Sequence, residues 1–362
     1  MNEFCYGAAS QNHRGCTMNW LAQISFWRVA WLVLSMAIVS GCADGTDYRV
    51  MQGETMGTYY RIQYAHTSSC QPSQFSVDNQ LVAFNRSLST YIADSELSLI
   101  NAAPAGDIAT TSKRLQHALS AAQRLWQDSG GAFDVTVGPL VNLWGFGAEK
   151  PQSWPPSKLA QAAAAESVGM QLLTLSPGGA LRKHHANTYI DLSSIAKGQA
   201  VDEVSESLLA LGCQDFLVDI GGEVRSAGLN RQRKLWRVGI EVPDPRQVGS
   251  VQRVLQMADN SVATSGDYRN FREFQGMRVD HVIDPRSGQP ADNSVLSVTV
   301  VHQSAMWADA YATALMVLGA DRGLAFATEH QIPVLMLLKS PTGEVVERYT
   351  SDMQTFLLNN AE

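Results

Sequence analysis

The stretch Ile190-Asp191-Leu192-Ser193-Ser194-Ile195-Ala196-Lys197-Gly198-Gln199-Ala200-Val201-Asp202 indicates how the centre of this chain folds. Apolar residues precede an acid, two hydroxyl residues follow where a helix N-cap would lie, and small residues surround Lys197. We therefore predict a strand end that turns into a helix. Such a turn presents backbone N–H groups, the positive end of the helix dipole and a lysine, which together suit a phosphate. An ordinary capped helix is the alternative interpretation.

Outward from this stretch, apolar residues recur with the periods of helices and strands. The helix is expected to end at Gly212, with a buried face formed by Val201, Val204, Leu208 and Leu211. A buried strand at 216–220 follows, and Gly221-Gly222 is expected to turn it back at Glu223. Further strands are predicted at 236–240, 251–257, 295–301, 334–338 and 345–349.

The N-terminal half is predicted to contain a strand pair around 56–62 and two amphipathic helices. These helices are expected to bury Val77, Leu81, Phe84 and Leu88, and then Leu115, Leu119, Ala122 and Leu125. The segment 131–147 is rich in glycine and is expected to form a loop, whose ordering needs a ligand or tight packing. Two further loops are expected at 263–268 and 281–288. In the second, a strand leads into a proline turn, so the sheet should fix the direction of His281.

A helix is predicted around residues 308–315, where Asp309 and Thr313 are four residues apart and therefore share one face. Small residues surround them and leave room above that face. Two oxygen ligands on such a face suit a hard cation such as Mg²⁺. Alternatively, Asp309 lies in the first turn and favours the helix dipole, while Thr313 bonds backward along the helix.

Length and composition indicate a globular protein. The chain has 362 residues, of which 45% are hydrophobic and 17% are charged. Its formal net charge of -7 and the lack of a basic run argue against nucleic acid as the main partner, because phosphate backbones are bound through clustered lysine and arginine.

The N-terminus has the pattern of a secretion signal. An apolar run at 29–39 is too short for a stable membrane anchor and ends in small residues before Cys42. Val39-Ser40-Gly41-Cys42 resembles a bacterial lipobox, which implies cleavage before Cys42 and lipid attachment to its sulfur; a plain signal or an uncleaved anchor is the alternative. We expect a signal peptide at 1–42, a linker at 43–50 and one domain at 51–362.

Two cysteines, Cys70 and Cys213, would remain in the mature domain. They could pair, but Cys213 lies between a helical and a strand-like run, which favours a buried thiol. No His/Cys cluster has the spacing of zinc ligands.

Eight motifs occur in the order found in the ApbE flavin transferases, and the chain from about Met51 onward resembles that family. The motifs lie at 55–58, 89–91, 131–147, 191–198, 219–222, 265–266, 281–288 and 308–318. The resemblance implies a T-fold-like α+β architecture, in which helices pack on antiparallel sheets, and the alternating strands predicted above agree with it. It also implies an enzyme that attaches FMN, taken from FAD, through its phosphate to a Thr or Ser of a target protein, releasing AMP.

The resemblance also implies roles for individual residues. An FAD site would be formed by Met56, Tyr91, Ala132, Phe133, Asp134, Asp191, Lys197 and Ile283, with Tyr91 facing the adenine ring. A Mg²⁺ site would be formed by Asp309, Thr313 and Ser194, the last through its hydroxyl or its main-chain carbonyl. His281 occupies the position of the histidine associated with catalysis, and a histidine of near-neutral pKa suits a general base.

Two other functions remain open on the sequence. The same site could release FMN and AMP to water as a metal-dependent FAD pyrophosphatase, or the chain could be a non-catalytic flavin-binding lipoprotein. We expect location in a bacterial cell envelope, facing the periplasm and held by the lipid on Cys42, with the inner membrane favoured over the outer.

Overall fold

The computed structural model describes residues 47–108, 110–147, 154–176, 178–244, 246–247, 249–266, 271–274, 277–291 and 294–358. Cys42 and the expected signal peptide lie outside these residues. The chain divides after Gly45, and the unit Thr46–Glu362 contains every described element. Among the described residues, no helix has the length and apolar character needed to cross a membrane.

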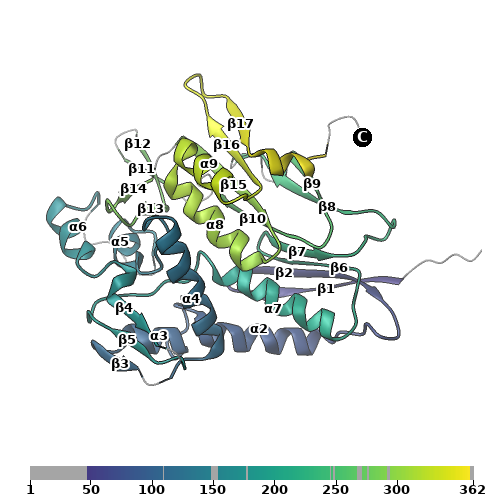
Figure 1. Ribbon diagram of the computed structural model, residues 1–362, viewed down its shortest axis with the longest axis horizontal. Coiled ribbons are helices and arrows are strands. Elements are labelled where there is room, and N and C mark those ends of the chain that lie inside the picture. Colours follow the sequence, from purple (N-terminus) through teal and green to yellow (C-terminus); the bar gives the residue numbers. More distant parts are fainter. Residues whose placement is uncertain are drawn as a thin grey trace, which may run out of the picture. The chain divides into compact units, whose positions relative to one another are not determined.

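An eight-stranded sheet runs through this unit (Figure 1). Its strands, in spatial order, are β1 (Asp47–Thr55), β2 (Thr58–His66), β6 (Phe216–Ile220), β7 (Glu223–Ala227), β10 (Ser261–Gly266), β15 (Val295–His302), β16 (Val334–Lys339) and β17 (Val345–Tyr349). Every neighbouring pair is antiparallel. The predicted α+β fold on antiparallel sheets is therefore confirmed.

Smaller sheets lie around the large one. Three short strands pair in the order β3 (Gly106–Ile108), β5 (Leu181–Lys183) and β4 (Leu173–Leu175). Three two-stranded ribbons are formed by β8 (Trp236–Glu241) with β9 (Val251–Met257), β11 (Phe271–Phe274) with β12 (Met277–Asp280), and β13 (Ile283–Asp284) with β14 (Gln289–Pro290).

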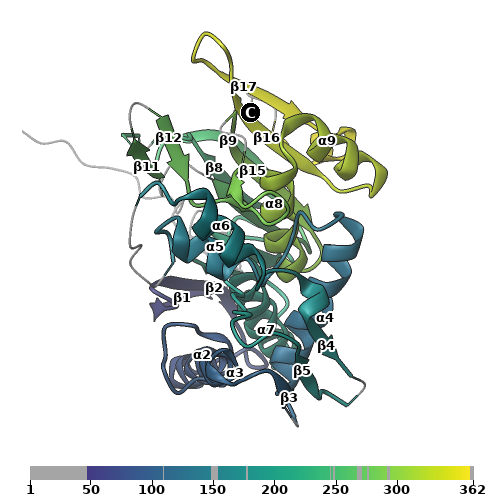
Figure 2. The same cartoon turned by 90° about the vertical axis from the view of Figure 1, so that its left-hand side faces the viewer.

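Helices cover one face of the large sheet, as two views at right angles show (Figures 1 and 2). The described helices are α2 (Gln74–Leu88), α3 (Glu96–Ala102), α4 (Lys113–Asp128), α5 (Gly138–Leu143), α6 (Lys158–Ala165), α7 (Ala196–Ala210), α8 (Ala305–Leu318) and α9 (Ala320–Glu329). Val298 and Met336 pack with α8, whereas Leu335 and Leu337 pack with β8 and β9 on the opposite face. Because both faces are covered, β15 is buried along almost its whole length.

Most of the predicted apolar faces are confirmed. Helix α2 buries Val77, Leu81, Phe84 and Leu88, and α4 buries Leu115, Leu119, Ala122 and Leu125. In α7 the predicted face is buried up to Leu208, but Leu211 is 50% exposed because it is the C-cap residue, beyond the last helical turn. The helix stops just before Gly212, the predicted end, and Gly212 has a φ of 83°.

The structure corrects the local prediction for the opening stretch. Helix α7 begins at Ala196, its N-cap residue is Ile195, and no side chain caps it, so Ser193 and Ser194 do not have the expected capping role. The Asp191 carboxylate instead accepts a hydrogen bond from the Ser193 N–H at 2.9 Å. This local bond forms a turn between the preceding extended segment and the helix.

Three segments expected to be irregular contain regular structure. The expected loop at 131–147 contains α5, whose second residue is Pro139, a favourable residue in a first helical turn. The first four residues of the expected loop at 263–268 belong to β10, because β15 pairs with them. The last four residues of the expected linker at 43–50 belong to β1.

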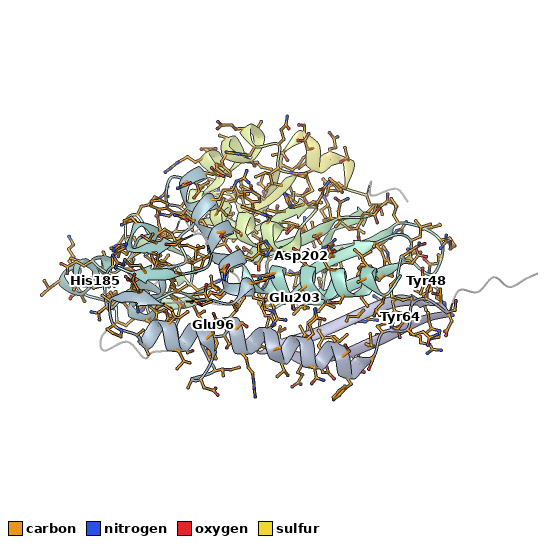
Figure 3. All side chains as sticks on the ribbon, turned by 60° about the horizontal axis from the view of Figure 1, so that its bottom comes forward. Tyr48, Tyr64, Glu96, His185, Asp202 and Glu203 are labelled. Atoms are coloured by element: carbon orange, nitrogen blue, oxygen red, sulfur yellow. A yellow bond between two sulfur atoms is a disulfide. The ribbon has the colours of Figure 1, made fainter. Side chains whose placement is uncertain are left out.

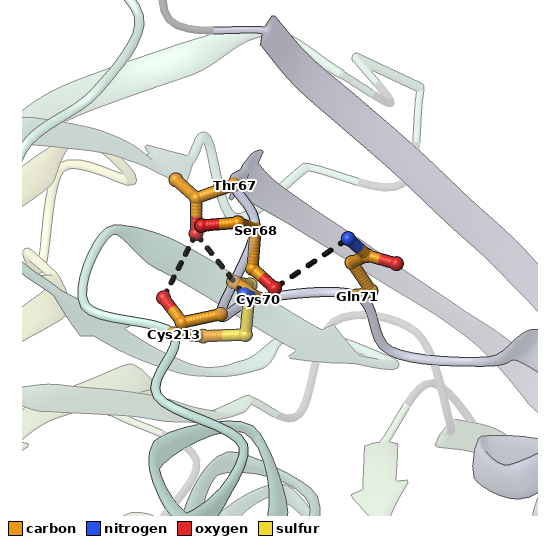
Figure 4. Close-up of a disulfide and its surroundings, with 6 residues drawn as sticks. Thr67, Ser68, Cys70, Gln71 and Cys213 are labelled. Atoms are coloured by element: carbon orange, nitrogen blue, oxygen red, sulfur yellow. Dashed lines mark hydrogen bonds between the residues drawn. A yellow bond between two sulfur atoms is a disulfide. The ribbon is translucent and has the colours of Figure 1, made fainter.

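Cys70 and Cys213 form a disulfide (Figure 4), so the expectation of a buried Cys213 thiol is wrong. The Cα atoms are 4.7 Å apart, and the two residues are 143 positions apart in the chain. Spacing alone did not reveal the pair, because the loop after β2 and the end of α7 meet only when β2 pairs with β6.

The two ends of the large sheet differ. At one end lie the β1–β2 turn and the β6–β7 turn, joined by a hydrogen bond of 3.0 Å from the Gly221 N–H to the Tyr59 carbonyl. At the other end β1 begins, where Asp47 pairs with His66. Since β1 has nine residues, these ends are about 30 Å apart at roughly 3.4 Å per residue.

Candidate active site

A cavity of about 400 Å³ opens at the end of the sheet that carries the β6–β7 turn. Its walls come from the start of α7, the first residue of β7, the end of β10, one face of α8, the 131–147 segment and the turn after β12. Eleven of the predicted site residues line it: Tyr91, Ala132, Phe133, Asp134, Asp191, Ser194, Lys197, His281, Ile283, Asp309 and Thr313.

Met56 lines an adjoining cavity of about 780 Å³. The two cavities share the residues Thr90, Tyr91, Asp191, Ser193 and Lys197. Together they make a continuous concave region with room for a ligand in two parts. The structure thus brings together every predicted FAD and metal residue. Cys42, the predicted lipid site, lies outside the described residues.

Helices α7 and α8 touch at Gly198. A Cβ atom there would lie 2.2 Å from the Ala305 carbonyl oxygen and 2.7 Å from the Met306 Cα, so only glycine allows this approach. The Gly198 N–H donates to Asp309 Oδ2 at 3.1 Å. This contact joins the lysine end of one helix to the acidic face of the other.

Asp202, one turn further along α7, fixes the start of α8. Its carboxylate accepts hydrogen bonds from the Ser304 hydroxyl at 2.6 Å and from the N–H groups of Ala305 and Met306 at 2.9 and 3.0 Å. Arg225 also donates to it at 3.0 Å. Asp202 lies beside Glu203 on α7 (Figure 3). Asp202 links α7 to α8, and Glu203 links α7 to α4 through its ion pair with Arg114.

Lys197, Glu223 and Asp309 form a charge cluster at the cavity wall, in which both acids are buried and the Lys197 side chain is 31% exposed. Lys197 makes an ion pair with Glu223, whose side chain is 4% exposed. Burial raises the pKa of Glu223 to about 8, although the Lys197 charge opposes that shift. Burial also raises the pKa of Asp309. Burial opposes the charge on Lys197, but Asp309 and Glu223 together hold its pKa above the usual value.

Asp309 and Thr313 share the cavity face of α8, as predicted. Asp309 is 4% exposed, and the Thr313 hydroxyl lies 3.2 Å from the Ser265 hydroxyl. Neither part of the alternative interpretation holds, because α8 has no acid in its first turn and Thr313 bonds to a neighbouring strand. Within the described residues no three His, Cys, Asp or Glu side chains group as a metal site. A cation here would therefore depend on one carboxylate with hydroxyl and main-chain oxygens.

The segment Ala132–Asp134 is buried against the cavity. Its Asp134 carboxylate accepts hydrogen bonds from the Thr136 N–H and hydroxyl at 2.8 and 2.5 Å, and from the Met170 N–H at 3.1 Å. Burial nevertheless raises the pKa of Asp134. The Asp134 side chain thus stabilises the loop from inside, which leaves the backbone of Ala132 and Phe133 at the cavity surface.

Asn101 holds the extended segment before α7. Its side-chain amide donates to the Ile190 carbonyl at 2.9 Å and accepts from the Ile190 N–H at 2.8 Å. The Asp191 N–H then donates to the Val135 carbonyl at 2.7 Å. These bonds place Asp191 between the glycine-rich loop and α7.

His281 directly follows β12 and lines the cavity. Its ring meets the Phe146 ring edge-on, with centroids 6.5 Å apart. Ile283 is buried in a cluster with Leu140 and Trp144. The Trp144 Nε1–H donates to the Gly288 carbonyl at 2.9 Å, which ties α5 to this turn.

Met56 and Tyr91 lie on the outer part of the cavity. Met56 has a φ of 50°, an uncommon conformation for a residue with a side chain, and it forms the β1–β2 turn with Gly57. Tyr91 is 81% exposed, so its ring is available to stack on a planar group.

Sequence reasoning missed Glu223 and Phe146. Glu223 was expected only as the residue after a turn, and its pairing with Lys197 depends on α7 packing against β7. Its one signal in the sequence is its place directly after the Gly221-Gly222 turn, which directs it to the same end of the sheet as Met56. Phe146 had no signal beyond the aromatic content of its segment.

Comparison with known proteins agrees with this geometry. The model of the ApbE family matches residues 56–336. An FAD:protein FMN transferase of Vibrio cholerae is 42% identical over 332 residues, which cover 90% of this chain and 98% of the relative. A protein of the same name from Escherichia coli K12 is 34% identical, covering 88% of this chain and 93% of the relative.

Solved structures show the same fold. The flavin transferase ApbE from Vibrio cholerae has a TM-score of 0.78 at 41% identity and covers 86% of this chain and 99% of its own. The apo flavinyl transferase ApbE of Pseudomonas stutzeri also has a TM-score of 0.78, at 36% identity, with coverage of 85% and 96%. Sequence, fold and the ordered motifs around one cavity agree: the chain belongs to the ApbE family.

Proposed function

We propose that this chain is an FAD:protein FMN transferase that works in the cavity between α7 and α8. The relatives described above carry this name. The observation that carries the proposal is the meeting of Lys197, Asp309 and His281 at one cavity, although they come from three distant parts of the sequence. A purely flavin-binding protein has no need of a buried acid–lysine cluster opposite a histidine.

The residues present suit a reaction at the FMN-side phosphorus of FAD. The hydroxyl oxygen of a Thr or Ser forms a bond to that phosphorus, and the bond to the bridging diphosphate oxygen breaks, so AMP departs. His281 would accept the hydroxyl proton. Lys197 would offset negative charge on the diphosphate, and the helix N-terminus adds a smaller contribution. The isoalloxazine side would pack near Phe133 and Ile283, and the adenine would stack on Tyr91.

The oxygens around Asp309 fit a magnesium ion. Asp309, Thr313 and Ser194 offer only oxygen atoms, the donor type that Mg²⁺ prefers. Glu223 Oε2 is buried with no hydrogen-bond partner among the described residues, so the site also holds an oxygen acceptor that its protein neighbours leave unsatisfied. When bound, Mg²⁺ supplies positive charge to the phosphate oxygens.

A direct assay separates this function from its alternatives. The chain from Ala43 onward keeps the compact unit Thr46–Glu362. It is incubated with FAD, Mg²⁺ and a candidate acceptor domain, and flavin fluorescence is measured on the denatured acceptor. Covalent fluorescence supports transfer, release of AMP and FMN alone supports the pyrophosphatase, and no reaction supports a binding protein.

Two variants test the assigned roles. His281→Ala should lower the transfer rate by about 10²-fold or more at saturating FAD, the contribution typical of a general base. An unchanged rate would remove His281 from the mechanism. Asp309→Ala should abolish stimulation by Mg²⁺, and full stimulation in that variant would place the cation elsewhere. Glu347→Gln, which removes an ion pair with Arg253 outside the cavity lining, is the matched control.

We also propose that the protein is a lipoprotein on the periplasmic side of the cell envelope, with the inner membrane favoured. The lipobox at Cys42 supports the anchor, and the Cys70–Cys213 disulfide supports an oxidising compartment. The strand that follows the anchor starts about 30 Å from the turn end of the sheet, where the cavity opens. Cys42→Ser should abolish incorporation of labelled palmitate; retained label would refute the anchor.

A further inference from the structure

Glu223 is the buried acid of the cavity to which no role has been given above. Glu223 is 3% exposed. One of its carboxylate oxygens makes the ion pair with the Lys197 ammonium, and the other, Oε2, has no hydrogen-bond partner among the described residues. A buried carboxylate oxygen without a partner is energetically unfavourable unless a ligand or a charge compensates it. Its presence at a ligand cavity therefore indicates a function.

The position of Glu223 is fixed by the sheet. It follows the Gly221-Gly222 turn, in which both glycines have positive φ values of 61° and 102°. The Asp219 carboxylate accepts a hydrogen bond from the Gly222 N–H at 3.0 Å and so closes this turn. Glu223 pairs with Ile220 across the hairpin. Because the turn is held on both sides, the Glu223 side chain is directed into the cavity.

Two acids act on the charge of Lys197. Its ammonium pairs with Glu223, and Asp309 acts on it electrostatically as well. Above the pKa of Glu223, which is about 8, and with no cation bound, an ionised pair of carboxylates faces one ammonium, so the cavity is negative where a diphosphate would bind. The same ammonium is the group expected to contact that diphosphate.

We propose that Glu223 makes the binding of the FAD diphosphate conditional on a divalent cation, by holding Lys197 and adding negative charge while the cation is absent. Glu223 is thus a positioning residue for Lys197. The inference rests on the proposed function, since it requires the cation at Asp309. Its physical consequence is a positive coupling: the cation and FAD each tighten the binding of the other by the same factor.

The test is equilibrium FAD binding, followed by flavin fluorescence, with either EDTA or excess Mg²⁺. A pH of about 9 keeps Glu223 ionised, because its pKa is about 8. In EDTA, Glu223→Gln should bind FAD about tenfold more tightly than the unchanged chain, the lower end of coupling between close charges. It should also lose most of the Mg²⁺ enhancement. Glu347→Gln should behave like the unchanged chain.

A merely structural role predicts a different result, because a disturbed cavity would bind FAD more weakly in both conditions. That outcome, or an unchanged Mg²⁺ enhancement in Glu223→Gln, would overturn the inference. The double variant Lys197→Met/Glu223→Gln should lose the gain in EDTA, since the released lysine produces it. A gain that persists without Lys197 would equally refute the holding role.

Asp309→Asn distinguishes failure of the inference from failure of the proposed cation site. If Asp309→Asn keeps the full Mg²⁺ enhancement, the proposed site is wrong whatever Glu223 does. If it loses the enhancement while Glu223→Gln keeps it, only the inference about Glu223 fails. Melting curves check that each variant folds. Should Glu223→Gln not fold, Glu223→Asp, which draws the carboxylate back by one methylene, should show a smaller gain in EDTA, and no gain would count against the inference.

Discussion

Replacing Gly198 by alanine should disable the cavity while leaving the protein folded. The added Cβ would lie 2.2 Å from the Ala305 carbonyl oxygen, and ordinary van der Waals contact begins near 3.4 Å. The two helices would therefore have to separate by about 1 Å at this point. Overpacking of this kind costs about 1–3 kcal/mol, partly offset by about 1 kcal/mol from the better helix propensity of alanine.

The functional effect should exceed the loss of stability. Separation of α7 from α8 lengthens the 3.1 Å hydrogen bond from the Gly198 N–H to Asp309 and moves Lys197 relative to that acid. A displacement of about 1 Å in a catalytic arrangement can cost about 10²-fold in rate. We expect FMN transfer to an acceptor to fall by about that factor, with a melting temperature only a few degrees lower.

Gly323→Ala in α9 is the matched control. Its added Cβ would meet the Met336 Cε at 2.8 Å, and this flexible methyl group can move aside. This variant should therefore keep its transfer activity. If Gly198→Ala also keeps activity within about threefold, close approach of α7 and α8 does not position the catalytic groups, and the geometric argument fails.

Three other perturbations have defined outcomes. Asp202→Ala should lower the free energy of unfolding, measured by denaturant titration, by about 2–3 kcal/mol, because Arg225 and the first N–H groups of α8 lose their acceptor. A change smaller than about 0.5 kcal/mol would contradict the role of Asp202 in holding the start of α8. Removing the disulfide with Cys70→Ala and Cys213→Ala should lower the free energy of unfolding by about 2–5 kcal/mol. An unchanged free energy of unfolding would show that the disulfide does not form in the cell. Burial raises the pKa of Glu223 from 4.5 to about 8, so between these pH values the folded chain keeps a proton that the unfolded chain releases. As pH rises from 4.5 to 8, the melting temperature of the unchanged chain should therefore fall relative to that of Glu223→Gln.

Most helices and turns of the fold were predicted from local sequence patterns. Helices α2 and α4 were predicted from the spacing of their apolar residues, because a helix buries one stripe of its surface whatever its partner is. Likewise, the Gly221-Gly222 turn was predicted from its sequence, since paired glycines allow the positive φ values that a tight hairpin needs. These features depend on neighbours in the chain.

Errors arose where a distant segment decided the local structure. Residues 263–266 were expected to form a loop, but β15 provides hydrogen-bonding partners that extend them into β10. Ser193 and Ser194 were expected to cap α7, yet Asn101 holds Ile190, three residues before Ser193, and the chain makes a different turn. Cys213 was expected to be a buried thiol because it lies between a helical and a strand-like run, but Cys70, 143 positions away, bonds to it. In each case the deciding contact is absent from any local window.

The candidate site was accessible from the sequence through the ordered motifs, but its electrostatics were not. A motif identifies Lys197 and Asp309 as individual positions, whereas their charges depend on burial and on what lies between them. Burial acts on all three members of the cluster, and it makes Glu223 as important to the charge of the cavity as the two residues that were predicted. Because the turn before Glu223 is closed by Asp219, the motif at 219–222 fixes where that buried charge lies. A motif with no ligand-binding side chain can therefore control a ligand site through the backbone.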